Sequence, residues 1–511
     1  MATTVFLTAA LALATWLVLR LFTQNRKLDM PYLKFEDGNN SMERYARESG
    51  SIMTRGYELY LKKGLPFAMF NCLEPSQPIA ILPIKYLAEV RGAAASKLSF
   101  PAFMNRSTVA DHIGAPPVTD RVTRVAKLDL NKALNDLIIP IQHTCTMVLD
   151  FILPHGKQDS EWTPVPAQVL FWAPISRVMT LVLVGPELCT NEEWNNLLAA
   201  YLHHGHATAK HVRETYRPWM RWTAKYLDKD VKAMAEFRKK GTALLKPVIE
   251  ARVKATGQSG GQKGPFKDAT QWLVDSYLAD GHGKGVDAEQ VMQDMSFLMA
   301  ASLHGILMNG VSILFDLIER PEALEAIREE VGKVQSETVS KQGGFWNRQT
   351  LGSLLVLDSF MKESQRLHTF QHYTMQRIAL QDVTFSDGLR IPAGTWLQMP
   401  SRMHGRDSDV VPGGHGEEFD ALRWKQLRQQ GDATKFHFAS VQDDMLPWGS
   451  GAHACPGRFL VQDVLKLIFI HLITKYDIKF AESESRPADL EDHTGTMPNI
   501  MSNVLFKERS V

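Results

Sequence analysis

Long apolar runs alternate with polar stretches rich in proline and glycine along the chain, and these runs predict a mostly helical protein. Apolar side chains recur at helical spacing over much of residues 119–255 and again over 456–475. Short apolar pieces such as 79-IAIL-82 and 383-VTFSDGLRIPAGTW-396 are bounded by turn residues and predict small strands. Because no repeat or linker divides residues 28–511, we expect one large, mainly α-helical domain with a minor β component.

One helix-compatible run, residues 290–320, is apolar almost all the way round. A helix of this kind is buried in a protein core or spans a membrane. The ionisable side chains of Asp294, His304 and Asp316 make a membrane span a poor interpretation. We therefore expect a buried helix of roughly 45 Å that crosses the whole domain.

The first residues form a separate apolar segment, and we assign 1–27 to an N-terminal membrane anchor. Residues 5–22 carry a single charge, Arg20, and as a helix they span about 27 Å, close to the thickness of a bilayer core. Positive charges follow this segment, which predicts a cytoplasmic body. A cleaved signal peptide is the alternative, with a weak cleavage pattern at residues 12–14, but the basic start of such peptides is missing.

Composition and charge exclude several classes of protein. The formal net charge of +1 gives no electrostatic footprint for nucleic acid. The cysteines are scattered without a Cys-x-x-Cys pair, which argues against a disulfide scaffold and a zinc cluster; they are Cys72, Cys145, Cys189 and Cys455. Four histidines lie close together in 201-YLHHGHATAKH-211, but no carboxylate or cysteine is near them in sequence, so we expect a solvated helix face.

The stretch 447-PWGSGAHACPGRFL-460 is the strongest candidate for chemistry. A glycine-rich turn lets the backbone approach a bulky planar group closely. A cysteine just before a helix lies in the positive field of the helix N-terminus, which favours the thiolate. A thiolate is a strongly donating axial ligand for haem iron. Taken alone, Cys455 would be interpreted as a buried structural cysteine.

The complete pattern, Trp-Gly-x-Gly-x-His-x-Cys-Pro-Gly from Trp448 to Gly457, resembles the haem-binding loop of the cytochrome P450 family, which usually has Phe at the first position. The resemblance implies haem b as the cofactor, with Cys455 as the ligand of its iron. It also implies a mostly α-helical fold with a long helix over the haem. Further cofactor contacts are implied for residues around the cysteine: His453, Gly449, Gly451 and Gly457.

A charged pair upstream extends the resemblance. Glu363 and Arg366 lie on one face of the helix expected over residues 354–368. Alone, such a pair is an ordinary surface ion pair. In the family it is buried and locked by a second arginine, which the resemblance assigns to Arg423. We interpret the three as structural, since removing one would leave a buried charge unpaired at a cost of about 3–5 kcal/mol.

Basic residues are the expected partners of the haem propionates. Arg377 matches the family arginine that pairs with a propionate, with a solvated strand arginine as the alternative. The family's usual Trp-x-x-x-Arg near residue 125 is absent. Arg124 is assigned in its place, and Arg121 and Lys127 stay open as alternatives.

The long helix carries 301-ASLHG-305, which aligns with the oxygen-activating motif Ala-Gly-x-Asp/Glu-Thr of the family. His304 stands at the acidic position, as in related fungal membrane-bound members with Ala-Ala-Ile-His-Thr-Thr, and Gly305 stands where threonine is usual. Glycine supplies no hydroxyl for proton delivery but leaves room for water. We predict His304 and Ser302 as the catalytic residues of a proton relay. The alternative is that His304 only packs in a groove and that the small residues make room for a bulky substrate.

The resemblance as a whole implies a haem-thiolate monooxygenase, held in the endoplasmic reticulum membrane, that uses O2 and electrons from an NADPH-cytochrome reductase. Residues 100–104, 370–373 and 497–501 are the expected lining of an apolar substrate pocket, with core packing as the alternative. Similarity to fungal members suggests a terpenoid, meroterpenoid or polyketide-derived secondary metabolite. Two other functions stay open: diversion of the same chemistry to rearrangement, ring expansion or desaturation, and a haem-binding sensor or carrier without turnover.

Overall fold

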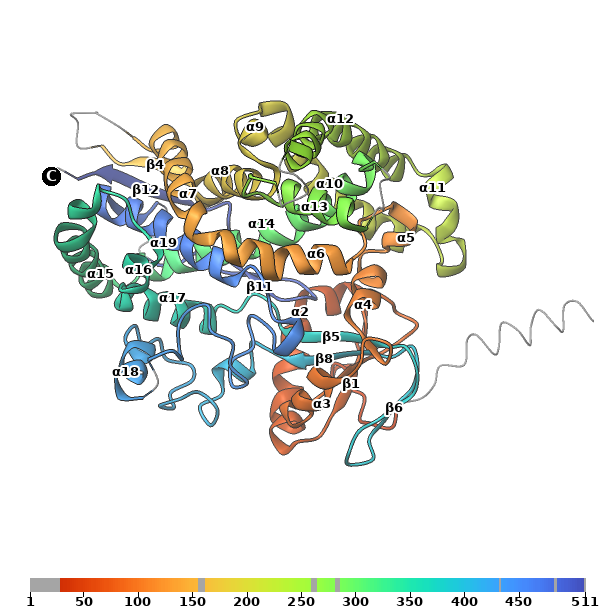
Figure 1. Cartoon of the computed structure of the whole chain (residues 1–511). Helices are drawn as coiled ribbons and strands as arrows, with labels where there is room; N and C mark the ends of the chain where they lie inside the picture. Colours follow the sequence, from red (N-terminus) through yellow and green to blue (C-terminus); the bar gives the residue numbers. More distant parts are fainter. Residues whose placement is uncertain are drawn as a thin grey trace, which may run out of the picture.

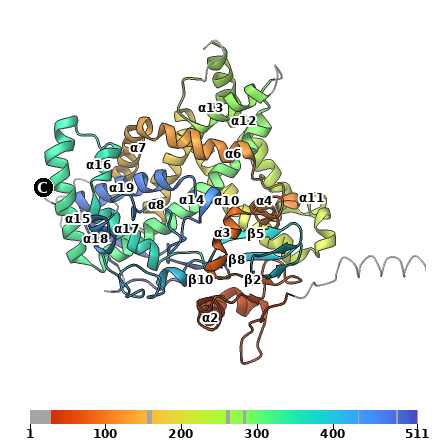
Figure 2. The same cartoon turned by 60° about the horizontal axis from the view of Figure 1, so that its bottom comes forward.

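The computed structural model describes residues 28–154, 161–258, 264–280, 285–431, 433–481 and 485–509. A large helical region and a smaller region rich in strands pack together, as Figure 1 and Figure 2 show from two directions. The expected mostly α-helical architecture with a minor β component is therefore confirmed. The expected anchor, residues 1–27, lies outside the described residues.

Helices make up most of the described chain. The α-helices are α2 (Met42–Leu59), α3 (Leu87–Gly92), α4 (Phe100–Ser107), α5 (Ala110–Ile113), α6 (Asp120–Arg124), α7 (Leu130–Ile152), α8 (Ala167–Met179), α9 (Pro186–Cys189), α10 (Glu192–Thr215), α11 (Ala224–Leu227), α12 (Lys229–Gln258), α13 (Ala269–Asp280), α14 (Ala288–Ile318), α15 (Pro321–Val334), α16 (Arg348–Gly352), α17 (Leu355–Leu367), α18 (Arg423–Gln430) and α19 (Arg458–Lys475). The helices predicted over 290–320, 354–368 and 456–475 correspond to α14, α17 and α19, within a few residues at each end.

The strands form small sheets at the edges of the helical region. The largest has the order β1-β2-β8-β5-β3, with β2 parallel to β8 and the other neighbours antiparallel. A second sheet has the order β4-β12-β9, and β6–β7 and β10–β11 are isolated pairs. The bounds are β1 (Phe67–Met69), β2 (Ile79–Ile81), β3 (Leu98–Ser99), β4 (Thr163–Pro166), β5 (Tyr373–Ala379), β6 (Val383–Thr384), β7 (Arg390–Ile391), β8 (Trp396–Pro400), β9 (Tyr476–Phe480), β10 (Leu490–Glu491), β11 (Thr496–Met497) and β12 (Asn503–Glu508).

The long helix α14 runs through the centre of the helical region and packs against α8, α12 and α17. Every residue from Ile306 to Leu317 is buried. At Gly310 a Cβ would lie 2.5 Å from the Phe171 ring, so glycine lets α8 approach closely. Two segments, α14 and Ala167–Val184, are long and apolar enough to cross a membrane, but 67% of each apolar stretch is buried in the protein. The expectation of a buried central helix is confirmed.

Candidate active site

The glycine-rich loop before α19 folds as a tight turn. Gly449 and Gly451 have φ angles of 71° and 67°, in the left-handed region that glycine adopts without strain. Gly451 also lacks room for a side chain, since a Cβ there would lie 2.2 Å from Cγ of Arg91. The Cys455 N–H donates to the Trp448 carbonyl at 2.7 Å, which closes the turn and places the cysteine at the start of α19.

The thiol of Cys455 is partly exposed at this helix start. Burial raises the pKa of the Cys455 thiol, and the backbone N–H groups of Gly457 and Arg458, which bond to the sulfur, offset only part of that rise. The field at the N-terminus of α19 therefore favours the thiolate less strongly than burial disfavours it. A metal cation at Sγ would hold one, because metal coordination deprotonates a thiol. Gly457 has an ordinary φ of −85° and contributes its N–H rather than conformational freedom.

Arg377, on β5, is a buried cation without a counter-charge. Its side chain is 3% exposed and donates to the Gln376 carbonyl at 2.8 Å. In the described part of the chain no carboxylate pairs with it, and burial lowers its pKa to about 10. Its Cζ lies 5.8 Å from the centre of the Phe100 ring, which in turn lies 6.1 Å from the ring of His453 in the loop. A buried guanidinium in this position fits an anionic group of a ligand.

Lys127 is the basic residue that reaches the loop from the helix preceding α7. Its Nζ donates to the Ala452 carbonyl, and after burial and Arg377 its charge is the next cause that lowers the pKa of His453. Arg124 instead is exposed and lines a surface pocket beside Arg121. This placement favours Lys127 over the predicted Arg124. Lys127 lies in the π-helical turn η3 (Val125–Asp129), which follows Arg124.

One face of α14 opens into an internal space. Ala300, Ala301 and His304 are exposed and Ser302 and Gly305 are partly exposed, although Met299, Leu303 and Ile306 beside them are buried. Burial by the surrounding protein nevertheless lowers the pKa of the His304 imidazole. The His304 ring stands edge-on to Phe370, with 6.0 Å between ring centres. A Cβ on Gly305 would meet Phe370 Cζ at 3.8 Å, an ordinary van der Waals contact, so a methyl-sized side chain fits at this position.

The sequence is similar to a known family over most of its length. A family model described as Cytochrome P450 matches residues 141–504, well over half of the chain. The chain belongs to the cytochrome P450 family. Members of this family are oxidoreductases with a thiolate-ligated haem, so the predicted family, enzyme class and cofactor are confirmed.

Fungal P450 enzymes are among its relatives. Cytochrome P450 monooxygenase cheE of Chaetomium globosum is 35% identical over 504 residues, covering 98% of this chain and 96% of that protein. Cytochrome P450 monooxygenase ccsG of Aspergillus clavatus is 35% identical, covering 94% and 93%. Pyrichalasin C-7 hydroxylase of Pyricularia grisea is 36% identical, covering 90% and 88%. These relatives indicate a haem monooxygenase of fungal secondary metabolism.

The charged triad of this P450 is buried as predicted. Arg366 donates to both carboxylate oxygens of Glu363, at 2.7 and 3.0 Å, and Arg423 Nε donates at 3.1 Å. Glu363 and Arg366 are fully buried. Sequence reasoning missed a fourth member, Trp424, whose Nε1 donates to Glu363 at 2.9 Å. Both arginines also donate to backbone carbonyls between residues 405 and 418, so the triad fixes the long irregular segment that leads to the loop.

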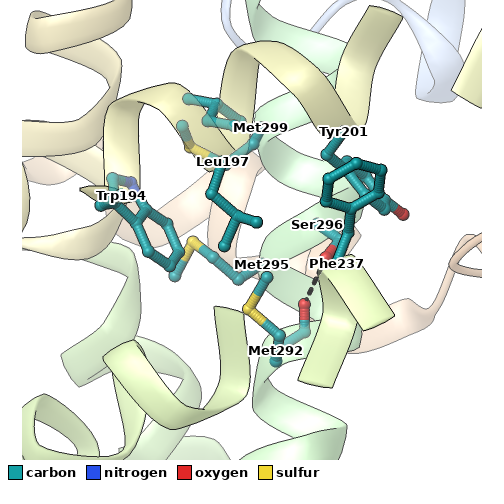
Figure 3. Close-up of a pocket in the computed structure, with 9 residues that line it drawn as sticks. Trp194, Leu197, Tyr201, Phe237, Met292, Met295, Ser296 and Met299 are labelled. Carbon is teal, nitrogen blue, oxygen red and sulfur yellow. Dashed lines mark hydrogen bonds between the residues drawn. The ribbon is translucent and has the colours of Figure 1, made fainter. Parts of the chain in front are cut away.

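The predicted pocket regions contribute unequally. Phe370 borders the open face of α14, but Tyr373 is 4% exposed and its hydroxyl contacts Met69 Sδ, on the other side of β5. A separate apolar pocket, shown in Figure 3, lies between α10, α12 and α14. Its α14 residues are Met292, Met295, Ser296 and Met299. At about 100° per residue, Met295 and Met299 lie largely on the opposite side of α14 from His304, whereas Ser296 lies about 80° from it.

The histidine-rich stretch of α10 is mostly a solvated helix face, as predicted, since His203, His204 and His206 are exposed. His211 gains a carboxylate that sequence reasoning missed, because Asp228 lies 2.9 Å from its Nε2 and Asp230 is close by. The Asp228 carboxylate also accepts from the N–H groups of Asp230 and Val231 and from the Tyr216 hydroxyl. The Asp228 carboxylate therefore accepts hydrogen bonds from the first backbone N–H groups of α12.

The residues around the loop fit a haem, and Arg377 provides the test. We propose that Arg377, Lys127 and His453 hold the propionates. Arg377→Leu is then expected to weaken haem retention while stabilising the haem-free protein by roughly 1–3 kcal/mol, because it removes an unpaired buried charge. Haem transfer to apomyoglobin and denaturant unfolding of the stripped protein measure the two effects.

The control for this test is Arg390→Leu, an exposed strand arginine that should change neither quantity. Retention of haem at the wild-type rate in Arg377→Leu would contradict the assignment.

Proposed function

We propose that this P450 hydroxylates a bulky apolar secondary metabolite, with Cys455 as the residue that would ligate its haem iron. The single observation that carries the proposal is the juxtaposition of a closed loop presenting Cys455 with a buried, unpaired Arg377. The haem supplies activation of O2. One oxygen atom is inserted into a C–H bond of the substrate and the other leaves as water, with two electrons from an NADPH-dependent reductase and two protons from solvent.

The open face of α14 supports a large substrate. Ala300, Ala301 and Gly305 present little or no side chain, and Phe370 adds an aromatic wall. Small residues on one wall and aromatic residues on another make space for a rigid, apolar molecule. The relative named pyrichalasin C-7 hydroxylase favours hydroxylation over rearrangement as the net reaction.

Product mass tests this function directly. Membranes holding the full chain and a reductase are supplied with a panel of terpenoid, meroterpenoid and polyketide-derived intermediates, pyrichalasin precursors included. A product heavier by one oxygen atom, with the label from ¹⁸O2, supports hydroxylation. Products of unchanged mass or lighter by two hydrogens would instead establish rearrangement or desaturation. The absence of product and of oxygen-dependent NADPH consumption would indicate a sensor or carrier.

His304 and Ser302 are proposed as a proton relay. The lowered pKa of His304 keeps its imidazole neutral at pH 7, able to accept a proton from one side and to donate on the other. Ser302 is partly exposed and its Oγ donates to the Met299 carbonyl at 3.1 Å, which leaves its lone pairs free to accept.

His304→Ala is therefore expected to lower product formed per NADPH about 10-fold or more, in the range typical of a lost acid–base group. Hydrogen peroxide should rise to match the electrons lost. His203→Ala, on the exposed face of α10, is the control. Unchanged coupling in His304→Ala would exclude the relay.

Attachment to the endoplasmic reticulum membrane is also proposed. Besides residues 1–27, exposed aromatic and apolar side chains gather in the short helix η5 (Pro218–Thr223) and α11: Trp219, Trp222, Tyr226 and Leu227, each at least 58% exposed. Trp and Tyr prefer the membrane–water interface. Sedimentation of the chain with and without residues 1–27, in the presence of vesicles, tests the anchor; a full-length chain that stays in the supernatant would contradict it.

A further inference from the structure

A buried pair of amide side chains lies behind the open turn of α14. Asn309 Nδ2 donates to the Gly305 carbonyl at 2.7 Å, and Asn309 Oδ1 accepts from Gln365 Nε2 at 3.2 Å. Asn309 and Gln365 are 6% and 3% exposed. The pair connects the turn at Gly305 with α17, although the two amides are 56 residues apart in the sequence.

The side chain of Asn309 restrains the backbone carbonyl of Gly305. In a helix the carbonyl of residue 305 accepts from the N–H of residue 309, and the Asn309 side chain adds a second donor to the same oxygen. Side-chain bonds of this kind bend helices and set the local direction of the carbonyl. Gly305 itself has no side chain, and a Cβ there would meet Phe370 Cζ at 3.8 Å.

Gln365 rests on a rigid base. It lies on α17 between residues that are held in place. Glu363 and Arg366 belong to the buried triad, and Ser364 Oγ donates to Asp316 Oδ2 on α14 at 2.5 Å. The Gln365 side chain is therefore held relative to α14. Its Oε1 is buried without a hydrogen-bond partner among the described residues, and buried acceptors are normally paired.

We propose that Asn309, held by Gln365, is a positioning residue of the oxygenation reaction. It fixes the Gly305 backbone, and thereby the width of the opening beside His304, which is the structural part of the task that the threonine hydroxyl performs elsewhere in the family. The proposal rests on the proposed function. If this turn is less rigid, disordered water enters beside His304, and more of the electrons from NADPH reduce O2 to hydrogen peroxide instead of forming product.

Asn309→Leu is the principal test, because leucine nearly matches the size of asparagine but donates no hydrogen bond. Product formed per NADPH is expected to fall about threefold or more with a matching rise in peroxide, while the substrate dissociation constant changes less than about twofold. Gln365→Leu should act in the same direction, and the double variant should be no worse than Asn309→Leu, since both break one chain of contacts.

A rescue separates positioning from general damage. Gly305→Thr, whose Cβ would make only an ordinary contact with Phe370, should restore coupling in the Asn309→Leu background and change little in the wild-type background. Met308→Leu, at a buried neighbouring position, is the control for disturbance of the core. Loss of coupling that Gly305→Thr does not restore would overturn the proposal, as would unchanged coupling in Asn309→Leu.

A readout without substrate keeps this test independent of the proposed function. The stretching frequency of CO bound to the reduced protein reports the polarity beside Gly305, and it should shift in Asn309→Leu and return in the rescue variant. If Asn309→Leu does not fold, Asn309→Asp keeps the shape and removes the donor. An unshifted CO frequency in a folded variant would contradict the positioning role even where no substrate is oxidised by the wild type.

Discussion

Cys455→Ser is expected to abolish the strongly red-shifted Soret band that the reduced protein shows with carbon monoxide, and to abolish product formation. The physical reason is the ligand atom. A thiolate donates electron density to haem iron far more strongly than a serine oxygen, and the band reports that donation. The loop itself should survive, because its closure depends on the backbone bond from the N–H of residue 455 to Trp448 and on the glycines, not on the sulfur.

The matched control is Cys72→Ser. Cys72 is also a partly exposed free cysteine, and burial raises its pKa to about 11, so it resembles Cys455 in environment but lies outside the loop. Its substitution should leave the difference spectrum unchanged. A red-shifted band that persists in Cys455→Ser would show that another residue ligates the iron.

Glu363→Gln is expected to lower the free energy of unfolding by about 3–5 kcal/mol, because it leaves the buried charges of Arg366 and Arg423 without a counter-charge. The Glu363 carboxylate accepts bonds from both arginines, from Trp424 Nε1 and from the backbone N–H of Asp420. Denaturant unfolding followed by tryptophan fluorescence measures the loss, and haem content should fall in parallel because the triad holds the segment before the loop.

Glu417→Gln is the control for this substitution. Glu417 pairs with Arg406 at 2.9 Å at the surface, with a side chain that is 69% exposed, so its loss should change stability by less than about 1 kcal/mol. If Glu363→Gln lowers the free energy of unfolding by no more than Glu417→Gln does, the triad contributes no more than a surface ion pair, and the structural role is contradicted.

Features that depend on neighbours in sequence could be predicted without the structure. The glycines and Cys455 act within one turn, so their spacing is enough to indicate the haem loop. The all-round apolar pattern of residues 290–320 predicts a buried helix because no other environment accepts it in a soluble domain. Glu363 and Arg366 are three residues apart on one helix, so their contact follows from helical geometry.

Features that depend on packing between distant segments were decided by the tertiary structure. Lys127, in the π-helical turn at 125–129, donates to the Ala452 carbonyl of the loop, whereas Arg124 is exposed, and the spacing of these basic residues in the sequence does not distinguish them. Burial of Cys455 outweighs the local field of α19, because burial depends on the whole core around the loop.

The bonds of Trp424 to Glu363 and of Gln365 to Asn309 join segments 61 and 56 residues apart. The chain itself specifies motifs and periodicity, because these follow from local geometry. Which polar side chains meet across the core follows only from how the helices pack, since a buried amide or indole finds its partner wherever the fold places one.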